Sequence, residues 1–346
     1  MTFQQLFKLI MGQSLSEPIT TKDTARCANA SFLVGSSCMQ GWRVEMEDAH
    51  THILSLPDDP PAAFFGVYDG HGGAAVSKFA GKHLHKFITN RPEYFGSSIE
   101  LAMKRAFLDF DREMLHNGSW GEQMAGSTAN VVLIKDRRLY CANAGDSRAI
   151  ASVGGMMRQL SVDHKPGNES EIKRIVAGGG RVENNRVNGN LALSRALGDF
   201  MYKRNTSMKP EEQIVTADPD VLCCDIGEDW EFVVLACDGI WDVMSSPQVA
   251  DFVRERIAGG MQPDLICEQL MDFCLAPTAY NYGLGGDNMT VILVCFLHGK
   301  SYDDLIQRLG GPKIANFETP VGDIGPDLKK KPLNTPNVSK SNMKHA

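Results

Sequence analysis

Short runs of β-branched and aromatic residues alternate with turn residues along most of the chain, beginning near residue 31. Runs of this length that are bounded by Gly, Pro, Asn and Asp are typical of antiparallel strands. The pattern predicts strands at residues 32–39, 49–54, 63–68, 128–135, 138–144, 148–153, 231–236 and 290–296.

Two pairs of helical segments interrupt these strands. Residues 73–89 carry apolar side chains at helix-like spacing, and Ser97 with Glu100 has the pattern of a capping box that opens a second helix. A later pair is expected at 246–257 and 263–275. Because the apolar stripe of each helix must cover a sheet face, strands grouped apart from paired helices predict an α+β fold.

Changes in composition divide the chain further. Residues 1–30 are expected to form an N-terminal extension and residues 31–298 a single domain. Within that domain, residues 161–219 are rich in Gly, Asn and Pro around a helical stretch at 169–177, which predicts a mobile flap. After residue 298 the apolar density falls, so residues 299–346 are predicted to be a polar and largely disordered tail.

Overall composition excludes several classes of protein. The chain has 346 residues and is 43% hydrophobic, which is enough for a substantial core. Its formal net charge of -7 argues against a nucleic-acid-binding protein. Nine cysteines without any C-x-x-C pair predict reduced thiols and a cytoplasmic or nuclear location. No apolar run is long enough to predict a transmembrane segment.

A short pattern near the N-terminus matches a signal for attachment of a lipid. Residues 11–16 match the N-myristoylation pattern M-G-x-x-x-[ST], provided that Gly12 becomes the N-terminal residue. Myristoylation of Gly12 would make the protein membrane-associated. The alternative is a coincidental match in a short, degenerate pattern, and nothing in the sequence sets the oligomeric state.

Several aspartates stand where predicted strands begin or end. Asp69 and Asp238 each follow an apolar strand, and Asp287 precedes one in a glycine-rich loop. Asp146 follows Gly145 in another predicted turn. Each position taken alone is also explained by an ordinary turn. Taken together, the aspartates are costly to bring close to one another unless a cation neutralises them.

The ligand types favour hard divalent cations. Carboxylates without Cys or paired His point to Mg²⁺ or Mn²⁺ rather than Zn²⁺. Two such ions can share one carboxylate and one water, whose lowered pKa suits it to attack phosphorus. His71, next to the Asp69-Gly70 turn, could then protonate the leaving alkoxide, and the forked guanidinium of Arg43 could bind phosphoryl oxygens.

These residues fall in motifs that closely resemble those of the PPM/PP2C protein phosphatases. The matching segments occur in the family's order and cover roughly residues 31–297. They are GWRVEMED (41–48), VYDGHGG (67–73), GSTA (126–129), AGDSR (144–148), LSRALGD (193–199), CDGIWD (237–242) and GDNMT (286–290).

The resemblance implies a fold and an activity. The implied fold is a four-layer α-β-β-α sandwich, in which two antiparallel sheets pack face to face with helix pairs outside. The implied activity is hydrolysis of phosphoserine and phosphothreonine in phosphorylated protein substrates. The implied cofactors are two Mg²⁺ or Mn²⁺ ions per chain, with a weaker third.

The resemblance also implies a role for each site residue. Arg43 would bind the substrate phosphate and His71 would donate a proton. For the two main ions, Asp69 would be the bridge, Asp238 and Asp287 would complete one site, and the Gly70 carbonyl would bind the other ion. Glu47 and Asp48 would hold waters that are bound to the metals. The third ion would be held by Asp146, Asp238 and Asp242.

Two alternatives and one structural prediction accompany this interpretation. A pseudophosphatase would typically lack Asp69, Asp238 or Asp287, whereas this chain has all three. A general hydrolase of small phosphomonoesters would turn over free metabolites and phosphopeptides equally well. Arg195 and Asp199 match a family motif, but we favour a structural ion pair between them that anchors the flap.

Overall fold

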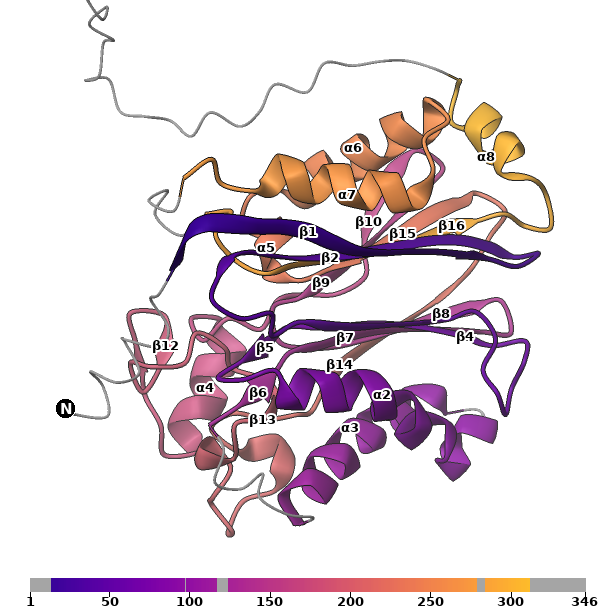
Figure 1. Cartoon of the computed structure of the whole chain (residues 1–346). Coiled ribbons are helices and arrows are strands. Elements are labelled where there is room, and N and C mark those ends of the chain that lie inside the picture. Colours follow the sequence, from indigo (N-terminus) through magenta and orange to yellow (C-terminus); the bar gives the residue numbers. More distant parts are fainter. Residues whose placement is uncertain (1–13, 97, 117–123, 279–283, 312–346) are drawn as a thin grey trace, which may run out of the picture. The chain divides into compact units, whose positions relative to one another are not determined.

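Antiparallel strands form two main sheets that face each other (Figure 1). The computed structural model describes residues 14–311 except 97, 117–123 and 279–283. The first sheet has the order β1 (Ser14–Ala28), β2 (Phe32–Arg43), β16 (Met289–Phe296), β15 (Trp230–Ala236), β9 (Arg148–Val153) and β10 (Met156–Gln159). The second has the order β14 (Asp220–Asp225), β8 (Arg138–Ala144), β7 (Ala129–Lys135), β4 (Ala63–Tyr68) and β3 (Ala49–Ile53).

Helices cover the outer face of each sheet (Figure 1). Helices α6 (Ser246–Ala258) and α7 (Pro263–Cys274) pack on the first sheet. Helices α2 (Ala75–Thr89) and α3 (Ile99–His116) pack on the second. The described residues therefore confirm the predicted α+β sandwich of helix, sheet, sheet and helix layers.

Strand β4 shows why the sheets hold together. All of its residues are buried because its alternating side chains serve two different cores. Phe64 and Tyr68 belong to the core beneath α2 and α3. Phe65 and Val67 belong to the core between the two sheets. An uninterrupted apolar run is thus the sequence signature of a strand that is covered on both faces.

Two segments outside the predicted domain form regular structure. Strand β1 lies within the predicted N-terminal extension and pairs with β2 from Ala28 back to Ser14. Helix α8 (Tyr302–Arg308) lies within the predicted tail and packs near α6, with Ser301 as its N-cap. Gly12 itself and most of the predicted tail, residues 312–346, lie outside the described residues.

The flap segment, residues 161–219, has a small core of its own. It contains α4 (Glu169–Ala177), β11 (Val182–Glu183), β12 (Arg186–Val187), β13 (Leu197–Gly198), and the 3₁₀ turns η3 (Phe200–Tyr202) and η4 (Pro210–Glu212). Ile175, Val187 and Val215 are fully buried against one another there. In a third sheet, β13 pairs with β6 (Gly126–Ser127), which pairs with β5 (Gly70–His71). This small sheet joins the flap segment to the Asp69-Gly70-His71 turn.

The remaining elements are short. Helix α5 (Asp238–Trp241) follows β15 directly, and the 3₁₀ turn η1 (Pro92–Phe95) connects α2 to α3. Among the described helices, none has the length and apolar character needed to cross a membrane. All nine cysteines lie in described segments and are free thiols, as the sequence predicted.

Candidate metal centre

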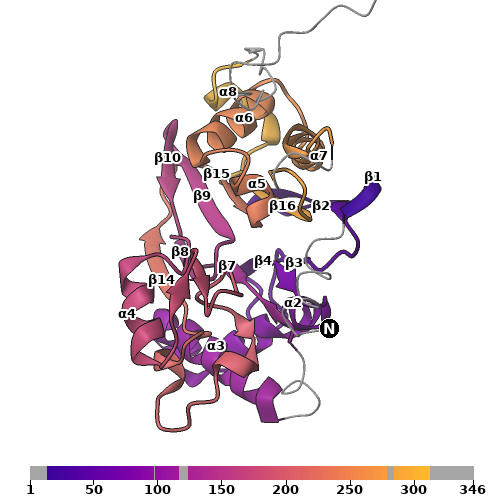
Figure 2. The same cartoon turned by 90° about the vertical axis from the view of Figure 1, so that its left-hand side faces the viewer.

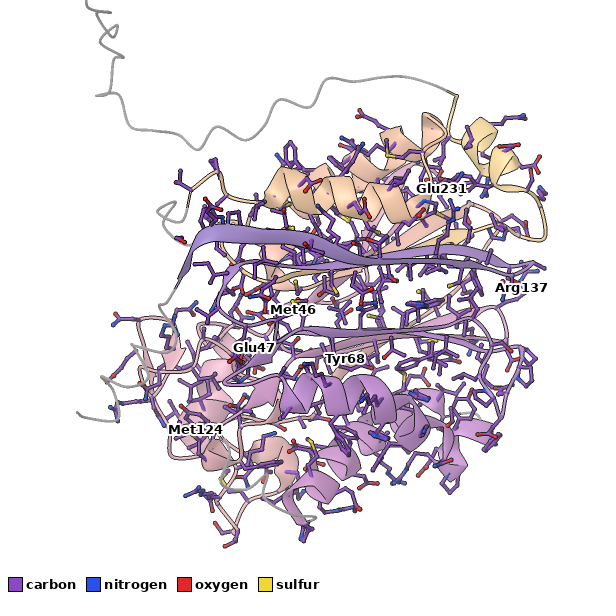
Figure 3. All side chains as sticks on the ribbon, viewed as in Figure 1. Met46, Glu47, Tyr68, Met124, Arg137 and Glu231 are labelled. Carbon is purple, nitrogen blue, oxygen red and sulfur yellow. The ribbon has the colours of Figure 1, made fainter. Side chains whose placement is uncertain are left out.

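Aspartates from distant parts of the chain lie at one edge of the sandwich. Asp69 follows β4, and Asp48 precedes the antiparallel neighbour β3. Asp238 follows β15, and Asp287 lies two residues before its antiparallel neighbour β16. In an antiparallel pair, the end of one strand and the start of the next meet at the same edge. Figure 3 shows Glu47 at this edge, whereas Arg137 lies at the far end of the sandwich. Figure 2 looks directly onto the edge, with α4 on the left and α2 on the right.

The acidic side chains at this edge form one group, which we call the carboxylate centre. Its members repel one another electrostatically: Asp48, Asp69, Asp146, Asp238, Asp242 and Asp287. Asp48 and Asp146 are buried, Asp69, Asp238 and Asp287 are partly buried, and Asp242 is exposed. Ligand atoms of Asp48, Asp69 and Cys237 lie within 4.8 Å of one another. The structure therefore brings together the aspartates that the sequence singled out.

Electrostatics within the centre disfavour the ionised carboxylates. Burial raises the pKa of Asp69 well above its usual value, and repulsion raises it further. The repelling carboxylates, in order of effect, are Asp238, Asp48, Asp287 and Asp146. The pKa of Asp238 is likewise raised by burial and by its neighbours. Burial raises the pKa of Asp48 to about 7.

Asp48 lies in the centre without an ion-pair partner among the described residues. The residue is 5% exposed, and its Oδ2 accepts a hydrogen bond from Thr290 Oγ1 at 2.7 Å. Its Oδ1 is buried without a hydrogen-bond partner among the described residues. A buried carboxylate oxygen of this kind is costly unless a cation or water binds it. Asp48 thus fits a hard divalent cation or a water molecule bound to one.

Arg43 and Glu47 lie at the rim of the centre. The Arg43 guanidinium donates to Asp287 Oδ2 at 2.5 Å. Burial alone would lower the pKa of Arg43, but the charge of Asp287 raises it on balance. Glu47 Oε1 accepts from the Gly73 main-chain N–H at 2.5 Å, and its main-chain oxygen accepts from the Ser77 hydroxyl. The predicted phosphate-binding guanidinium therefore lies beside the carboxylates.

Asn288 holds the Arg43–Glu47 loop in place, a role that the sequence analysis does not predict. Its Oδ1 accepts from the Glu47 N–H at 2.9 Å, and its Nδ2 donates to the main-chain oxygens of Gln40 and Glu45. Gly41 has a φ of +65°, and a Cβ there would lie 2.7 Å from the Asp287 main-chain oxygen. The signal for both residues was their place within the GWRVEMED and GDNMT segments.

Asp146 has a partner that the sequence did not indicate. Lys165, at the start of the flap segment, forms an ion pair with Asp146 Oδ2. Burial raises the pKa of Asp146, although the Lys165 ammonium group opposes this effect. The charge of Asp242 raises the pKa of both Asp146 and Lys165. The predicted group of Asp146, Asp238 and Asp242 is thus assembled, with one lysine beside it.

The predicted ion pair between Arg195 and Asp199 is wrong. Arg195 instead binds Glu171 at 2.8 Å and Asp220 at 2.9 Å. The Oδ2 atom of Asp199 lies 2.7 Å from the Nε2 atom of His71. Residues four apart are close neighbours on a helix, whereas this segment is extended at β13 and turns at Asp199, where φ is +52°. The structure thus gives His71 an acidic partner that sequence spacing concealed.

Gly126 makes room for the His71–Asp199 pair. A Cβ at this position would lie 2.3 Å from Asp199 Oδ2 and 2.5 Å from His71 Nε2. Burial lowers the pKa of His71, but the charge of Asp199 more than offsets that effect, and the pKa is raised. His71 is therefore held by Asp199 beside the carboxylate centre, and its role as proton donor stays a prediction.

The fold and the centre define a class of protein before any relative is considered. An α-β-β-α sandwich with buried carboxylates at one edge, a rim arginine and a carboxylate-bound histidine is suited to metal-assisted hydrolysis of phosphate esters. The sequence model of the family "Protein phosphatase 2C" matches residues 32–282. The chain belongs to this family, and it is a serine/threonine protein phosphatase.

Curated relatives agree over most of the chain. A probable protein phosphatase 2C of Caenorhabditis elegans is 56% identical over 304 residues, which are 88% of this chain and 85% of the relative. Protein phosphatase 2C homolog 2 of Schizosaccharomyces pombe is 47% identical over 299 residues, which are 85% of this chain and 81% of the relative. The similarity therefore includes the flap segment and both sheets.

Solved structures agree with the fold. A phosphatase from Toxoplasma gondii superimposes with a TM-score of 0.68 at 29% identity, and covers 80% of this chain and 96% of its own. A serine-threonine phosphatase 2C from the same organism has a TM-score of 0.66 at 22% identity, over 80% of this chain and 99% of its own. The second likeness concerns the fold alone.

Proposed function

We propose that this phosphatase works with two hard divalent ions, Mg²⁺ or Mn²⁺, held at the carboxylate centre. The observation that carries the proposal is the burial of mutually repelling carboxylates around Asp69 without enough positive charge to neutralise them. Asp69, Asp238 and Asp287 would bind the ions directly, together with the Gly70 carbonyl. When bound, the ions supply a water of lowered pKa for in-line attack on phosphorus, and offset charge on the phosphoryl oxygens.

The protein side chains orient the substrate and move the proton. The Arg43 guanidinium offers a fork of donors for two phosphoryl oxygens, which positions the phosphorus over the centre. His71 donates a proton to the seryl or threonyl oxygen as it leaves, because an alkoxide is a poor leaving group. Asp199 holds the His71 ring through Nε2 and stabilises its charged form. Glu47 and Asp48 orient waters at the ions.

A weaker third ion is proposed at Asp146, Asp238 and Asp242. The Lys165 ammonium group already pairs with Asp146, so an ion there must compete with a built-in cation. This competition is a physical reason for lower affinity at that position. The mutual repulsion of the three carboxylates supports the assignment.

Metal binding is tested without relying on turnover. The protein is first treated with a chelator, and the binding of Mn²⁺ is then followed by isothermal titration calorimetry. Two tight ions and a weaker third per chain are expected, with Asp146→Asn removing only the weak one. Binding of one ion or none would contradict the proposal.

Activity provides the second test. Hydrolysis of a phosphothreonine peptide is expected to vanish with EDTA and to return with Mg²⁺ or Mn²⁺. The ratio of kcat/KM for the peptide to that for free phosphometabolites separates a protein phosphatase from a general phosphomonoesterase. Turnover that persists in EDTA would rule out the metal-dependent mechanism.

A further inference from the structure

Helix α2 presents a stripe of lysines to solvent. Lys78, Lys82 and Lys86 are spaced four residues apart and are exposed. Side chains at this spacing lie one above another along one face of a helix, so the lysine stripe extends for about 12 Å. The helix contains no Asp or Glu at all, although the whole chain has a net charge of -7.

The charge of the lysine stripe is not neutralised locally. Within the described part of the chain, none of its three ammonium groups forms an ion pair. Three acidic residues of neighbouring segments pair with other cations: Asp59 with Lys135, Asp109 with Arg91, and Asp111 with Lys203. Asp58 lines a hollow together with Lys86.

The positive charge of the stripe lowers the pKa of a neighbouring histidine. Burial lowers the pKa of His83, and the charges of Lys86 and Lys82 lower it further. Like charges four residues apart on a helix repel one another. An anionic ligand bound along the stripe would relieve this repulsion.

The lysine stripe begins next to the carboxylate centre. Helix α2 starts at Ala75, and the preceding Gly73 donates its N–H to Glu47. In the first turn, Ser77 donates its hydroxyl to the Glu47 main-chain oxygen, and Lys78 follows directly. From there the helix runs away from the centre along the second sheet (Figure 1). The lysine stripe is therefore a straight path that leads outward from the phosphate-binding rim.

We propose that the lysine stripe binds an acidic stretch of the phosphoprotein substrate next to the phosphorylated residue. The proposal rests on the serine/threonine phosphatase activity and adds a substrate preference to it. An extended chain advances about 3.3 Å per residue, so a stripe of about 12 Å would meet about four successive residues, which we place within roughly two to seven positions of the phosphoresidue. Carboxylates or further phosphates at those positions would pair with the ammonium groups.

An anionic membrane is the main alternative occupant of the lysine stripe. Helices that bind membranes insert large apolar side chains between their basic residues. The described residues of α2 expose no large apolar side chain, whereas Val76, Ala80 and Leu84 are buried beneath it. The charge pattern without an apolar anchor favours a peptide over a lipid surface.

The test uses three phosphothreonine peptides of equal length. One carries Glu at positions two to seven before the phosphothreonine, one carries Glu at the same positions after it, and one carries Gln at all of them. With Mn²⁺ saturating, KM and kcat are measured for each, together with p-nitrophenyl phosphate turnover. We expect one acidic peptide to have a KM lower than that of the Gln peptide by roughly fivefold, with similar kcat.

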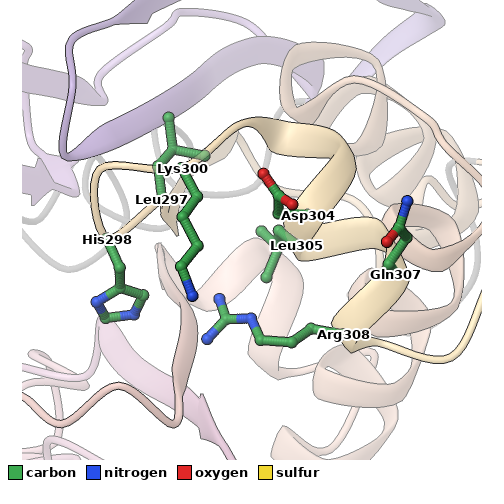
Figure 4. A pocket seen from close by; sticks show the side chains of 7 residues that line it. All are labelled: Leu297, His298, Lys300, Asp304, Leu305, Gln307 and Arg308. Carbon is green, nitrogen blue, oxygen red and sulfur yellow. The ribbon is translucent and has the colours of Figure 1, made fainter.

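Charge-neutral variants locate the effect. The triple variant Lys78→Gln/Lys82→Gln/Lys86→Gln is expected to raise the KM of the preferred acidic peptide to that of the Gln peptide, while p-nitrophenyl phosphate turnover is unchanged. Lys300→Gln is the matched control, because Lys300 is also exposed and forms no ion pair with any described residue. It lines a hollow of about 320 Å³ with His298 and Arg308, beside α8 on the side of the first sheet (Figure 4).

The outcomes are distinct. Equal KM values for all three peptides on the unaltered protein, or an acidic preference that survives the triple variant, would overturn the proposal. So would an equal loss with Lys300→Gln, because net charge would then be the cause. Lysine-dependent binding to phosphatidylserine vesicles without any peptide preference would assign the stripe to membranes instead. If the unaltered protein does not hydrolyse p-nitrophenyl phosphate in saturating Mn²⁺, the result contradicts the metal-dependent mechanism and not the role of the lysine stripe.

Discussion

The carboxylate centre and the flap segment both bury acidic side chains, but they neutralise them differently. Glu171 of α4 is 1% exposed and pairs with Arg174 and Arg195. Although burial raises the pKa of Glu171, the two arginines lower it to about 2. In the carboxylate centre, burial and repulsion both raise the pKa of Asp69. Carboxyl groups thus favour opposite protonation states in the two regions.

This difference separates structural charges from functional ones. Glu171, Arg174 and Arg195 satisfy one another, so they connect parts of the flap segment and need no ligand. Asp69 and Asp238 cannot be satisfied by protein groups alone, so they are available to an external cation. A buried carboxylate therefore indicates a metal site when its protein partners are mainly other carboxylates, and a structural role when they are arginines.

Removal of one charge from the centre gives the largest expected effect. Asp69→Asn should reduce phosphopeptide turnover to near background, because the proposed bridge between the ions is lost. In EDTA, its thermal unfolding midpoint should be no lower than that of the unaltered protein, because one repelling charge has been removed. Differential scanning fluorimetry and peptide kinetics measure the two effects. The control is Asp225→Asn, which changes an exposed acid on β14. Near-normal turnover of Asp69→Asn in saturating Mn²⁺ would refute the proposed role of Asp69 in binding the ions.

His71 provides the next largest effect, at the junction of the two regions. His71→Ala should slow phosphothreonine hydrolysis by about 100-fold or more, because the alkoxide leaves without a proton. It should slow p-nitrophenyl phosphate far less, because that leaving group needs little protonation. The two substrates are compared at the same pH and metal concentration, and equal losses on both would argue against a proton-donor role.

Asp199 sharpens this prediction, because it reaches His71 from the flap segment. Asp199→Asn should reproduce part of the His71→Ala loss, with the same dependence on the leaving group. In the His71→Ala background it should add little, since it acts through the ring. A full additive loss in the double variant would show that Asp199 has a separate role.

A change at Glu171 should affect stability more than catalysis. Glu171→Gln should lower the free energy of unfolding by about 2–4 kcal/mol, because it leaves buried arginines without their carboxylate. Urea denaturation measures the loss. The control is Glu169→Gln on the same helix, where the exposed pair with Lys173 should contribute less than about 0.5 kcal/mol. Similar losses for both variants would contradict the distinction between buried and exposed pairs.

The pH dependence of stability gives the smallest expected effect. Because the folded pKa of Glu171 is about 2 and its usual value is 4.5, its contribution is fully present above pH 4.5 and is lost as the pH falls toward 2. The stability difference between the unaltered protein and Glu171→Gln should therefore shrink by about 2 kcal/mol between pH 6 and pH 3. A difference that stays constant over this range would show that ionisation of Glu171 does not contribute.

Local patterns in the sequence predicted most of the architecture. The strands at 63–68, 138–144 and 148–153 have the predicted bounds, because apolar runs between turn residues have few other ways to bury their side chains. Strand β1 was missed because it is polar along much of its length and is held by main-chain pairing with β2. Helix α8 was missed because seven residues are too short for a clear helical period.

The sequence by itself determined which residues are the candidates for the chemistry. Asp69, Asp238 and Asp287 were identifiable because a carboxylate at a strand end has a fixed position and a recognisable neighbourhood of glycines. Only the tertiary structure decided which charges meet. Arg195 turned to Glu171, Asp199 to His71, and Lys165 to Asp146, because partners in a folded chain are set by the crossing of distant segments, on which sequence spacing carries no information.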